Sequence, residues 1–424
     1  MIGLHIGLGS IVVENPPQYL KDGLRCFRRN DDGEGYYEDL YSLSSDGSRL
    51  ATMPGFASRI RRILNDKKDD VRVFDVRMPM PKPDHNRAMS CVHEFWRKPI
   101  CEALKTRGGT VHIPGIGKSD VAAAIIRAYS AADLMDRGTP YSIVVTRDKL
   151  SAKKMAHDLR VLLPDREVGL CESARLCDFE DIIVINATSL EEVPRWAAGI
   201  LIACNLNPND DGIDVIRAIR EISSVRNAAR WGIFEDYGSF QVDMMTEGLF
   251  GPVVTSSTYA DAVRLGYAVP ITVCWLPAPR IPPVGSCPFN TLEAMVTQNE
   301  DFYRLLANIV KRTPSEMGVR MYADHMGNGG KLKTLAKESE KNFLNADVLL
   351  LATCRADMSK IRLPGRKTRG PKDMCYIVTF SHDWDMHNGH HGYLARYDEA
   401  RKQYFRALGF RQMYVGDIEQ LPFL

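Results

Sequence analysis

Two patterns of apolar residues alternate along the middle of this chain. Between residues 86 and 278, short β-branched runs such as GTVHI, SIVVT, DIIVIN and GILIAC are separated by longer amphipathic segments. Short continuous apolar runs predict strands buried on both faces, and the longer segments predict helices. Their alternation predicts an α/β fold in which a parallel sheet is covered by helices.

The same pattern of apolar and polar residues divides the chain into four parts. Residues 1–85 contain short strand-like runs and a basic amphipathic helix, which predict a small N-terminal α+β accessory domain. Residues 86–278 form the alternating α/β domain, and residues 279–298 a linker. Residues 299–424 contain three strand-like runs, GVRMYADH, ADVLLLAT and CYIVTF, so we expect an abbreviated second α/β domain.

One junction in the middle domain has the composition of a phosphate-binding loop. The apolar run that ends at Ile113 is followed by PGIGKS and then by an Ala/Ile-rich helical segment. Gly115 and Gly117 would let successive N–H groups face one anion at the start of the helix. Lys118 would neutralise a terminal phosphate, and Ser119 would offer its hydroxyl to Mg²⁺. The alternative is an ordinary strand-to-helix turn with an exposed lysine.

Composition indicates the cellular compartment of the protein but does not indicate its ligand. No apolar run has the length of a membrane span, and the ten cysteines form no CxxC pair. Both observations predict a soluble cytoplasmic protein with reduced thiols. A net charge of +2 does not decide for or against nucleic acid. The basic segment PGFASRIRRILNDKK is interpreted as the solvated face of a helix rather than as a DNA contact.

Several longer segments, taken in order, resemble one family. They are RKPICEALKTRGGTVHIPGIGKSDVAAAIIRAY, LFGPVVTSSTYADAVRLGYAVPITVCWLP, ADVLLLATCRAD, LPGRKTRG and YIVTFSHDWDMHNGHHGYLARYDEARKQYFRALGF. Together they resemble the superfamily-two DNA helicases of the phage and repair type, whose nucleotide box reads DEAD or DEAH. The resemblance implies two RecA-like P-loop domains, ATP and Mg²⁺ as cofactors, and DNA as partner, whether single-stranded, duplex or branched. It also implies protein partners in replication or recombination, and the host cytoplasm for a phage-encoded protein.

The resemblance assigns roles to two sets of residues. The phosphates are assigned to the loop, that is, to Gly115, Ile116, Gly117, Lys118 and Ser119. The second set lies in PGRKTRG, where Gly365, Arg366 and Arg369 match an element whose arginines reach the γ-phosphate. A planar guanidinium there stabilises the charge that develops during phosphoryl transfer. Without the family resemblance, this segment would be interpreted as an ordinary basic loop.

Four positions depart from the family pattern. Where the acidic box is expected, the strand GILIAC ends in Cys204 and is followed by Asn205. A neutral pair neither holds Mg²⁺ nor polarises the attacking water. The segment GIFEDYG lacks the hydroxyls of the next motif, Ile100 replaces the glutamine that reads adenine, and Arg362 replaces the glutamine that opens the arginine element.

Other polar residues offer alternatives. The missing acids could be supplied by either of two pairs, Asp210 with Asp211 or Glu235 with Asp236, although carboxylates in loops after strands are usually just solvated. A second group has the chemistry of metal ligands without a known spacing: His382, Asp383, Asp385, His387, His390 and His391. We therefore expect a helicase-like DNA-binding protein that binds ATP and turns it over negligibly. The alternative is a pseudo-helicase scaffold for DNA or protein partners.

Overall fold

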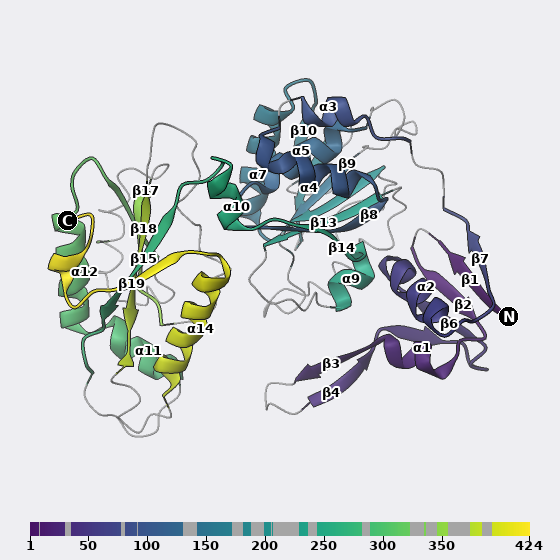
Figure 1. Ribbon diagram of the computed structural model, residues 1–424, viewed down its shortest axis with the longest axis horizontal. Coiled ribbons are helices and arrows are strands. Elements are labelled where there is room, and N and C mark those ends of the chain that lie inside the picture. Colours follow the sequence, from purple (N-terminus) through teal and green to yellow (C-terminus); the bar gives the residue numbers. More distant parts are fainter. Residues whose placement is uncertain are drawn as a thin grey trace. The chain divides into compact units, whose positions relative to one another are not determined.

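The computed structural model divides the chain into two compact units. Unit 1 holds Met1–Ile113 and Gly117–Ser257, and unit 2 holds Thr258–Leu424 together with the short segment Pro114–Ile116. The structure describes residues 1–7, 9–29, 35–77, 81–90, 92–129, 142–171, 181–187, 199–204, 206, 229–235, 244–281, 289–322, 335, 346–354, 374–383 and 392–424. Each unit is built around parallel strands (Figure 1).

Unit 1 begins with a small α+β domain. Its five-stranded sheet has the order β5-β6-β2-β1-β7. The strands are β1 (Ile2–Ile6), β2 (Ile11–Glu14), β5 (Tyr41–Leu43), β6 (Arg49–Thr52) and β7 (Val71–Asp75), and β3 (Arg25–Arg29) pairs with β4 (Gly35–Asp39) in a separate hairpin. The helices are α1 (Gln18–Gly23), η1 (Pro54–Phe56) and α2 (Ala57–Asp66).

The predicted basic helix is α2, and its two faces have different roles. Ile60 and Leu64 are fully buried, as amphipathic periodicity requires. On the other face, the Arg59 guanidinium forms an ion pair with Glu247 of the following α/β domain. Arg61 and Arg62 are both exposed. One of the predicted surface arginines therefore has a structural role.

The rest of unit 1 is a seven-stranded sheet whose pairings are all parallel. Its order is β10-β11-β9-β12-β13-β8-β14. The strands are β8 (Gly108–Ile113), β9 (Ser142–Thr146), β10 (Val168–Cys171), β11 (Ile182–Asn186), β12 (Ile200–Cys204), β13 (Ala229–Glu235) and β14 (Val253–Ser256). The helices before and within it are α3 (His85–Met89), α4 (Glu94–Leu104), α5 (Lys118–Arg127), α7 (Lys149–Leu162) and α9 (Met244–Phe250). Figure 1 shows α4, α5 and α7 on one face of the sheet and α9 on the other.

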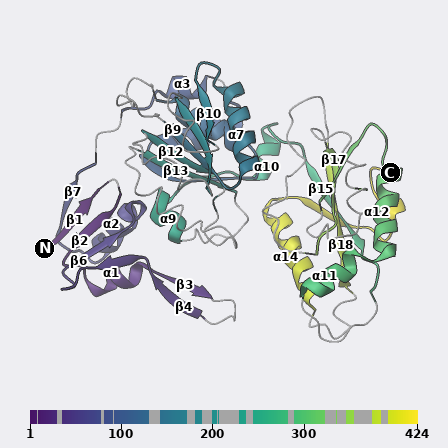
Figure 2. The same cartoon turned by 180° about the vertical axis from the view of Figure 1, so that it is seen from behind.

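The described residues of unit 2 contain a five-stranded parallel sheet with the order β16-β17-β18-β15-β19. The strands are β15 (Ile271–Pro277), β16 (Gly318–Tyr322), β17 (Ala346–Leu351), β18 (Cys375–Ser381) and β19 (Arg411–Tyr414). The helices are α10 (Tyr259–Arg264), α11 (Phe289–Thr297), α12 (Glu300–Arg312) and α14 (Tyr393–Ala407), and η5 (Ile418–Gln420) follows the last strand. Both views place α12 and α14 on opposite faces of this sheet (Figures 1 and 2).

The two parallel sheets share one topology. In unit 1, the strands β9-β12-β13-β8-β14 lie side by side, so the first strand of this set in sequence lies between the fourth and the fifth. Unit 2 repeats this arrangement with β16-β17-β18-β15-β19. Ligands of open parallel sheets bind beyond the carboxyl ends of the strands, at the point where the strand order reverses. In unit 1 this point lies at the end of β8. The predicted α/β fold with two parallel-sheet domains is confirmed.

The second domain differs from the sequence-based expectation. We assigned Ile271–Pro277 to the first α/β domain, but this strand pairs with β18 and β19. This domain begins before the expected linker at residues 279–298, in which α11 also lies, and its described sheet has five strands. A continuous apolar strand contains no local signal for the sheet that it joins, because its partners lie more than a hundred residues further along the chain.

The helix α14 buries a cluster of charges at the strand ends of unit 2. Asp398 and Arg401 are 1% and 0% exposed, and they form an ion pair. The Asp398 carboxylate accepts a hydrogen bond from the backbone N–H of His382 at 2.5 Å and lies 3.1 Å from its Nδ1. Arg401 donates to the carbonyl oxygens of Thr353, at 2.5 Å, and Phe380, at 3.0 Å. The cluster therefore joins the ends of β17 and β18 to α14.

Candidate nucleotide-binding site

The strand, turn and helix expected around the phosphate-binding loop are present. Strand β8 is buried between β13 and β14, and four residues separate its end at Ile113 from the start of α5 at Lys118. Gly115 and Gly117 have φ angles of 74° and 81°, in the left-handed region that favours glycine. Gly117 is the N-cap of α5. The first N–H groups of a helix have no partner within it, so this turn leaves donors at the carboxyl edge of the sheet.

Lys118 is held by a carboxylate from the neighbouring strand. Its Nζ forms an ion pair with Oε1 of Glu235, the last residue of β13. The Lys118 side chain is 26% exposed and the Glu235 side chain 10% exposed. The ammonium group therefore lies at the strand edge, where it already binds an anionic oxygen. A phosphate that entered the loop would compete with Glu235 for it.

Ser119 contacts a helix rather than the loop. Its buried hydroxyl donates to Oδ2 of Asp158 on α7 at 3.1 Å, and Lys154 Nζ lies 3.3 Å from the same oxygen. A hydroxyl that donates its proton keeps its oxygen lone pairs, which are the atoms a metal ion requires. The Mg²⁺ role predicted for Ser119 remains a prediction.

Cys204 occupies the end of β12 as a neutral thiol. It is 3% exposed, and burial raises the pKa of the thiol to about 12 although the charge of Lys118 acts in the opposite direction. A protonated thiol is a poor ligand for Mg²⁺, which prefers oxygen. In the parallel register, Cys204 lies beside Ile233, and Glu235 lies beside Ile113 of β8. Glu235 therefore ends the strand that separates Cys204 from the phosphate-binding loop.

Several predicted residues cannot be placed. Outside the described residues lie Asn205, Asp210, Asp211, Asp236, Arg362, Gly365, Arg366, Arg369, Asp385, His387, His390 and His391. Ile100 is fully buried in α4, so it contributes to the core. His382 is bound to Asp398. Within the described ranges, no three His, Cys, Asp or Glu side chains form a group that could hold a metal ion.

Sequence reasoning missed two contacts of the loop. The ion pair between Lys118 and Glu235 joins residues 117 positions apart, and the Ser119–Asp158 hydrogen bond joins residues 39 apart. Glu235 had a partial signal, because it is a carboxylate at the end of the apolar run ARWGIFE. Asp158 had none, because an acid in the polar face of a helix is ordinarily solvated.

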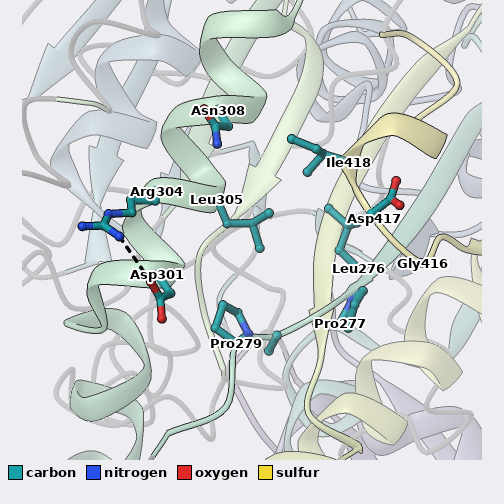
Figure 3. Close-up of a pocket in the computed structure, with 11 residues that line it drawn as sticks. Leu276, Pro277, Pro279, Asp301, Arg304, Leu305, Asn308, Gly416, Asp417 and Ile418 are labelled. Atoms are coloured by element: carbon teal, nitrogen blue, oxygen red, sulfur yellow. Dashed lines mark ion pairs between the residues drawn. The ribbon is translucent and has the colours of Figure 1, made fainter.

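Unit 2 has a pocket at the equivalent topological position, with different chemistry. The pocket has a volume of about 490 Å³ and lies at the end of β15, beside α12 and the segment before η5 (Figure 3). In the lining of this pocket, an Nη atom of Arg304 lies 3.7 Å from Oδ1 of Asp301 in an exposed ion pair. Asp417 adds a second carboxylate to the lining. Pro277 and Pro279 line the site and have no N–H to donate. The features of a phosphate-binding loop thus lie at the end of β8 and not at the end of β15.

No protein-family model matches the chain, and no curated protein matches it. Solved structures do. A fragment of a putative HsdR subunit of a type I restriction enzyme from Vibrio vulnificus YJ016 is 12% identical, with a TM-score of 0.50 over 96% of this chain and 78% of that one. UvsW of phage T4 is 12% identical, with a TM-score of 0.46 over 98% and 99% of the two chains. Dbp5 of S. cerevisiae bound to RNA and ADP BeF3 is 10% identical, with a TM-score of 0.49 over 78% and 92%.

These neighbours are superfamily-two helicases. At this identity the comparison shows the fold alone, and the chain shares with the HsdR fragment an architecture of two parallel-sheet, RecA-like domains. The resemblance that the sequence predicted is therefore confirmed at the level of the fold, which by itself assigns no activity. In the described part of the chain, none of the helices combines the length and the apolar character needed to cross a membrane.

Proposed function

We propose that this protein is a helicase-like DNA-binding protein that binds ATP with Mg²⁺ at the loop between β8 and α5. The observation that carries the proposal is the glycine turn with Lys118 at the helix N-terminus, held against an anionic oxygen of Glu235. The helicase-like fold supports nucleic acid as the second ligand.

The loop supplies three kinds of contact to a triphosphate. The N–H groups at the start of α5 and the helix dipole attract phosphate oxygens. Lys118 leaves Glu235 and binds a phosphate group, whose negative charge it neutralises. Ser119 presents a hydroxyl oxygen from the first turn of α5. Bound Mg²⁺ neutralises charge on the phosphates, and the protein must hold it by oxygen ligands.

The same site is poorly equipped for hydrolysis. The acid expected at the end of β12 is the neutral thiol of Cys204, and the next residue in sequence is Asn205. Without a carboxylate that orients the attacking water, phosphoryl transfer loses most of its positioning and electrostatic stabilisation. This observation favours a second candidate function, a pseudo-helicase scaffold that keeps the fold for binding DNA or protein partners.

Titration with a fluorescent ATP analogue tests the nucleotide site. We expect Lys118→Ala to lower the affinity at least tenfold, because the triphosphate loses a direct counter-charge. Lys98→Ala removes an exposed lysine of α4 and serves as the matched control, with unchanged affinity. Equal affinities of the wild type and Lys118→Ala would exclude this loop as the nucleotide site.

A further inference from the structure

We infer that Glu235 is the carboxylate that positions Mg²⁺ in this site, in place of the acid that is missing at Cys204. The inference rests on the proposed nucleotide site and adds a residue to it. It assigns Glu235 two successive partners, Lys118 before the nucleotide binds and the metal ion of a bound magnesium nucleotide. The inference assigns Glu235 to the metal ion alone and assigns no residue to the activation of the attacking water.

Strand register places Glu235 close to the position of the expected acid. Cys204 ends β12, and its neighbour in register on β13 is Ile233, two residues before Glu235. Residues two apart on a strand point to the same face, as do neighbours in register. Cys204 and Glu235 therefore share one face at the carboxyl edge of the sheet. Neighbouring strands lie about 4.8 Å apart, and glutamate is one methylene group longer than aspartate, so a carboxylate on β13 can serve ligands near the end of β12.

Lys118 connects the two positions. Its ammonium group forms the ion pair with Glu235, and its charge acts on the Cys204 thiol. The strand that carries Glu235 also pairs directly with β8, which leads into the phosphate-binding loop. The partner of Lys118 in this ion pair is thus a carboxylate, which can bind a hard cation such as Mg²⁺.

Charge balance explains why the partners would exchange. Glu235 is 10% exposed, and a carboxylate at that depth is costly unless a cation compensates it. When phosphate oxygens take over Lys118, the Glu235 carboxylate loses this cationic partner. The Mg²⁺ that accompanies the nucleotide is the cation that restores the balance. Binding of nucleotide without Mg²⁺ would take one cation from Glu235 and supply none in its place, and this binding should therefore be weaker.

Affinity for a fluorescent ATP analogue, measured with and without Mg²⁺, tests this exchange. In the wild type we expect Mg²⁺ to increase the affinity at least tenfold. In Glu235→Gln we expect tighter binding of the metal-free analogue, because a competitor for Lys118 is gone, and an Mg²⁺ effect below about twofold. Glu102→Gln, which removes an exposed partner of Lys105, is the matched control and should behave as the wild type.

Two further variants separate a metal-positioning role from a counter-ion role. Glu235→Asp keeps the charge and should retain most of the Mg²⁺ effect. Cys204→Asp in the Glu235→Gln background returns a carboxylate to the end of β12 and should restore the effect. Thermal unfolding of each variant without nucleotide checks that the fold is kept.

The outcomes distinguish the two proposals. If the wild type binds the analogue through Lys118 and Glu235→Gln keeps the full Mg²⁺ effect, Glu235 is only a counter-ion and the inference is overturned, while the nucleotide site stands. If the wild type does not bind the analogue under either condition, the proposed nucleotide site itself is wrong, and the role of Glu235 with it.

Discussion

Replacing Asp398 by asparagine should strongly destabilise unit 2. Asp398 is 1% exposed. Its carboxylate makes two contacts with His382, to the backbone N–H and to Nδ1. It also forms an ion pair with Arg401, which is fully buried. The substitution preserves the size of the side chain and removes its charge, so two buried basic groups lose their counter-ion. Breaking a buried ion pair on one side typically costs about 3–5 kcal/mol, because the remaining charge is left uncompensated.

The change in melting temperature that this loss of unfolding free energy causes depends on the size of unit 2. The segment Thr258–Leu424 forms nearly all of the unit. For domains of about 150–250 residues, each kcal/mol shifts the melting temperature by about 2–4 °C. A loss of about 3–5 kcal/mol therefore predicts a decrease of about 6–20 °C in the transition of unit 2.

Differential scanning calorimetry on the full chain measures this transition. The matched control is Glu399→Gln, which changes an exposed acid on the next position of the same helix and should shift the transition by less than about 0.5 kcal/mol. If Asp398→Asn melts within that same margin of the wild type, the buried cluster does not hold α14 to the strand ends as argued.

Two other predictions concern pH and DNA. Burial alone would lower the pKa of His382, but Asp398 and Cys354 raise it from 6.5 to about 9. The stability that the His382–Asp398 pair contributes should therefore be complete below about pH 6.5 and be lost as the pH rises to about 9. Urea unfolding should show that the difference in unfolding free energy between the wild type and His382→Gln becomes smaller over that range. A constant difference would contradict the raised pKa of His382. Affinity for DNA, measured by fluorescence anisotropy, should fall steeply with salt and depend little on base sequence, because phosphate contacts release counterions; no binding to single-stranded, duplex or branched DNA at low salt would reject DNA as the partner.

Local patterns were enough to predict the elements around the phosphate-binding loop. The apolar run before Ile113, the two glycines and the Ala-rich segment after Lys118 specify strand, turn and helix through short-range preferences. The same reasoning gave the α/β class, because fully apolar strands alternate with amphipathic helices. These features are each encoded within about twenty residues of sequence.

Long-range pairing was not predictable in the same way. The strand Ile271–Pro277 joins β18 and β19 of unit 2, and nothing in its apolar residues distinguishes that sheet from the preceding one. Strand β19, with the sequence RQMY, is short and mostly polar, so it lacked the pattern of a buried strand. The partners of Lys118 and Ser119 likewise lie on other elements and are fixed only by the packed fold.

This protein combines the proposed nucleotide-binding loop with Cys204 and Asn205 at the positions where the acids for hydrolysis are expected. DNA-stimulated phosphate release tests the consequence of this combination most directly. We expect negligible ATP turnover by the unmodified protein even with saturating DNA, and some recovery in the Cys204→Asp, Asn205→Glu double variant, which introduces both expected acids. Rapid turnover by the unmodified protein that disappears in Lys118→Ala would contradict this expectation and show that other carboxylates complete a working motor.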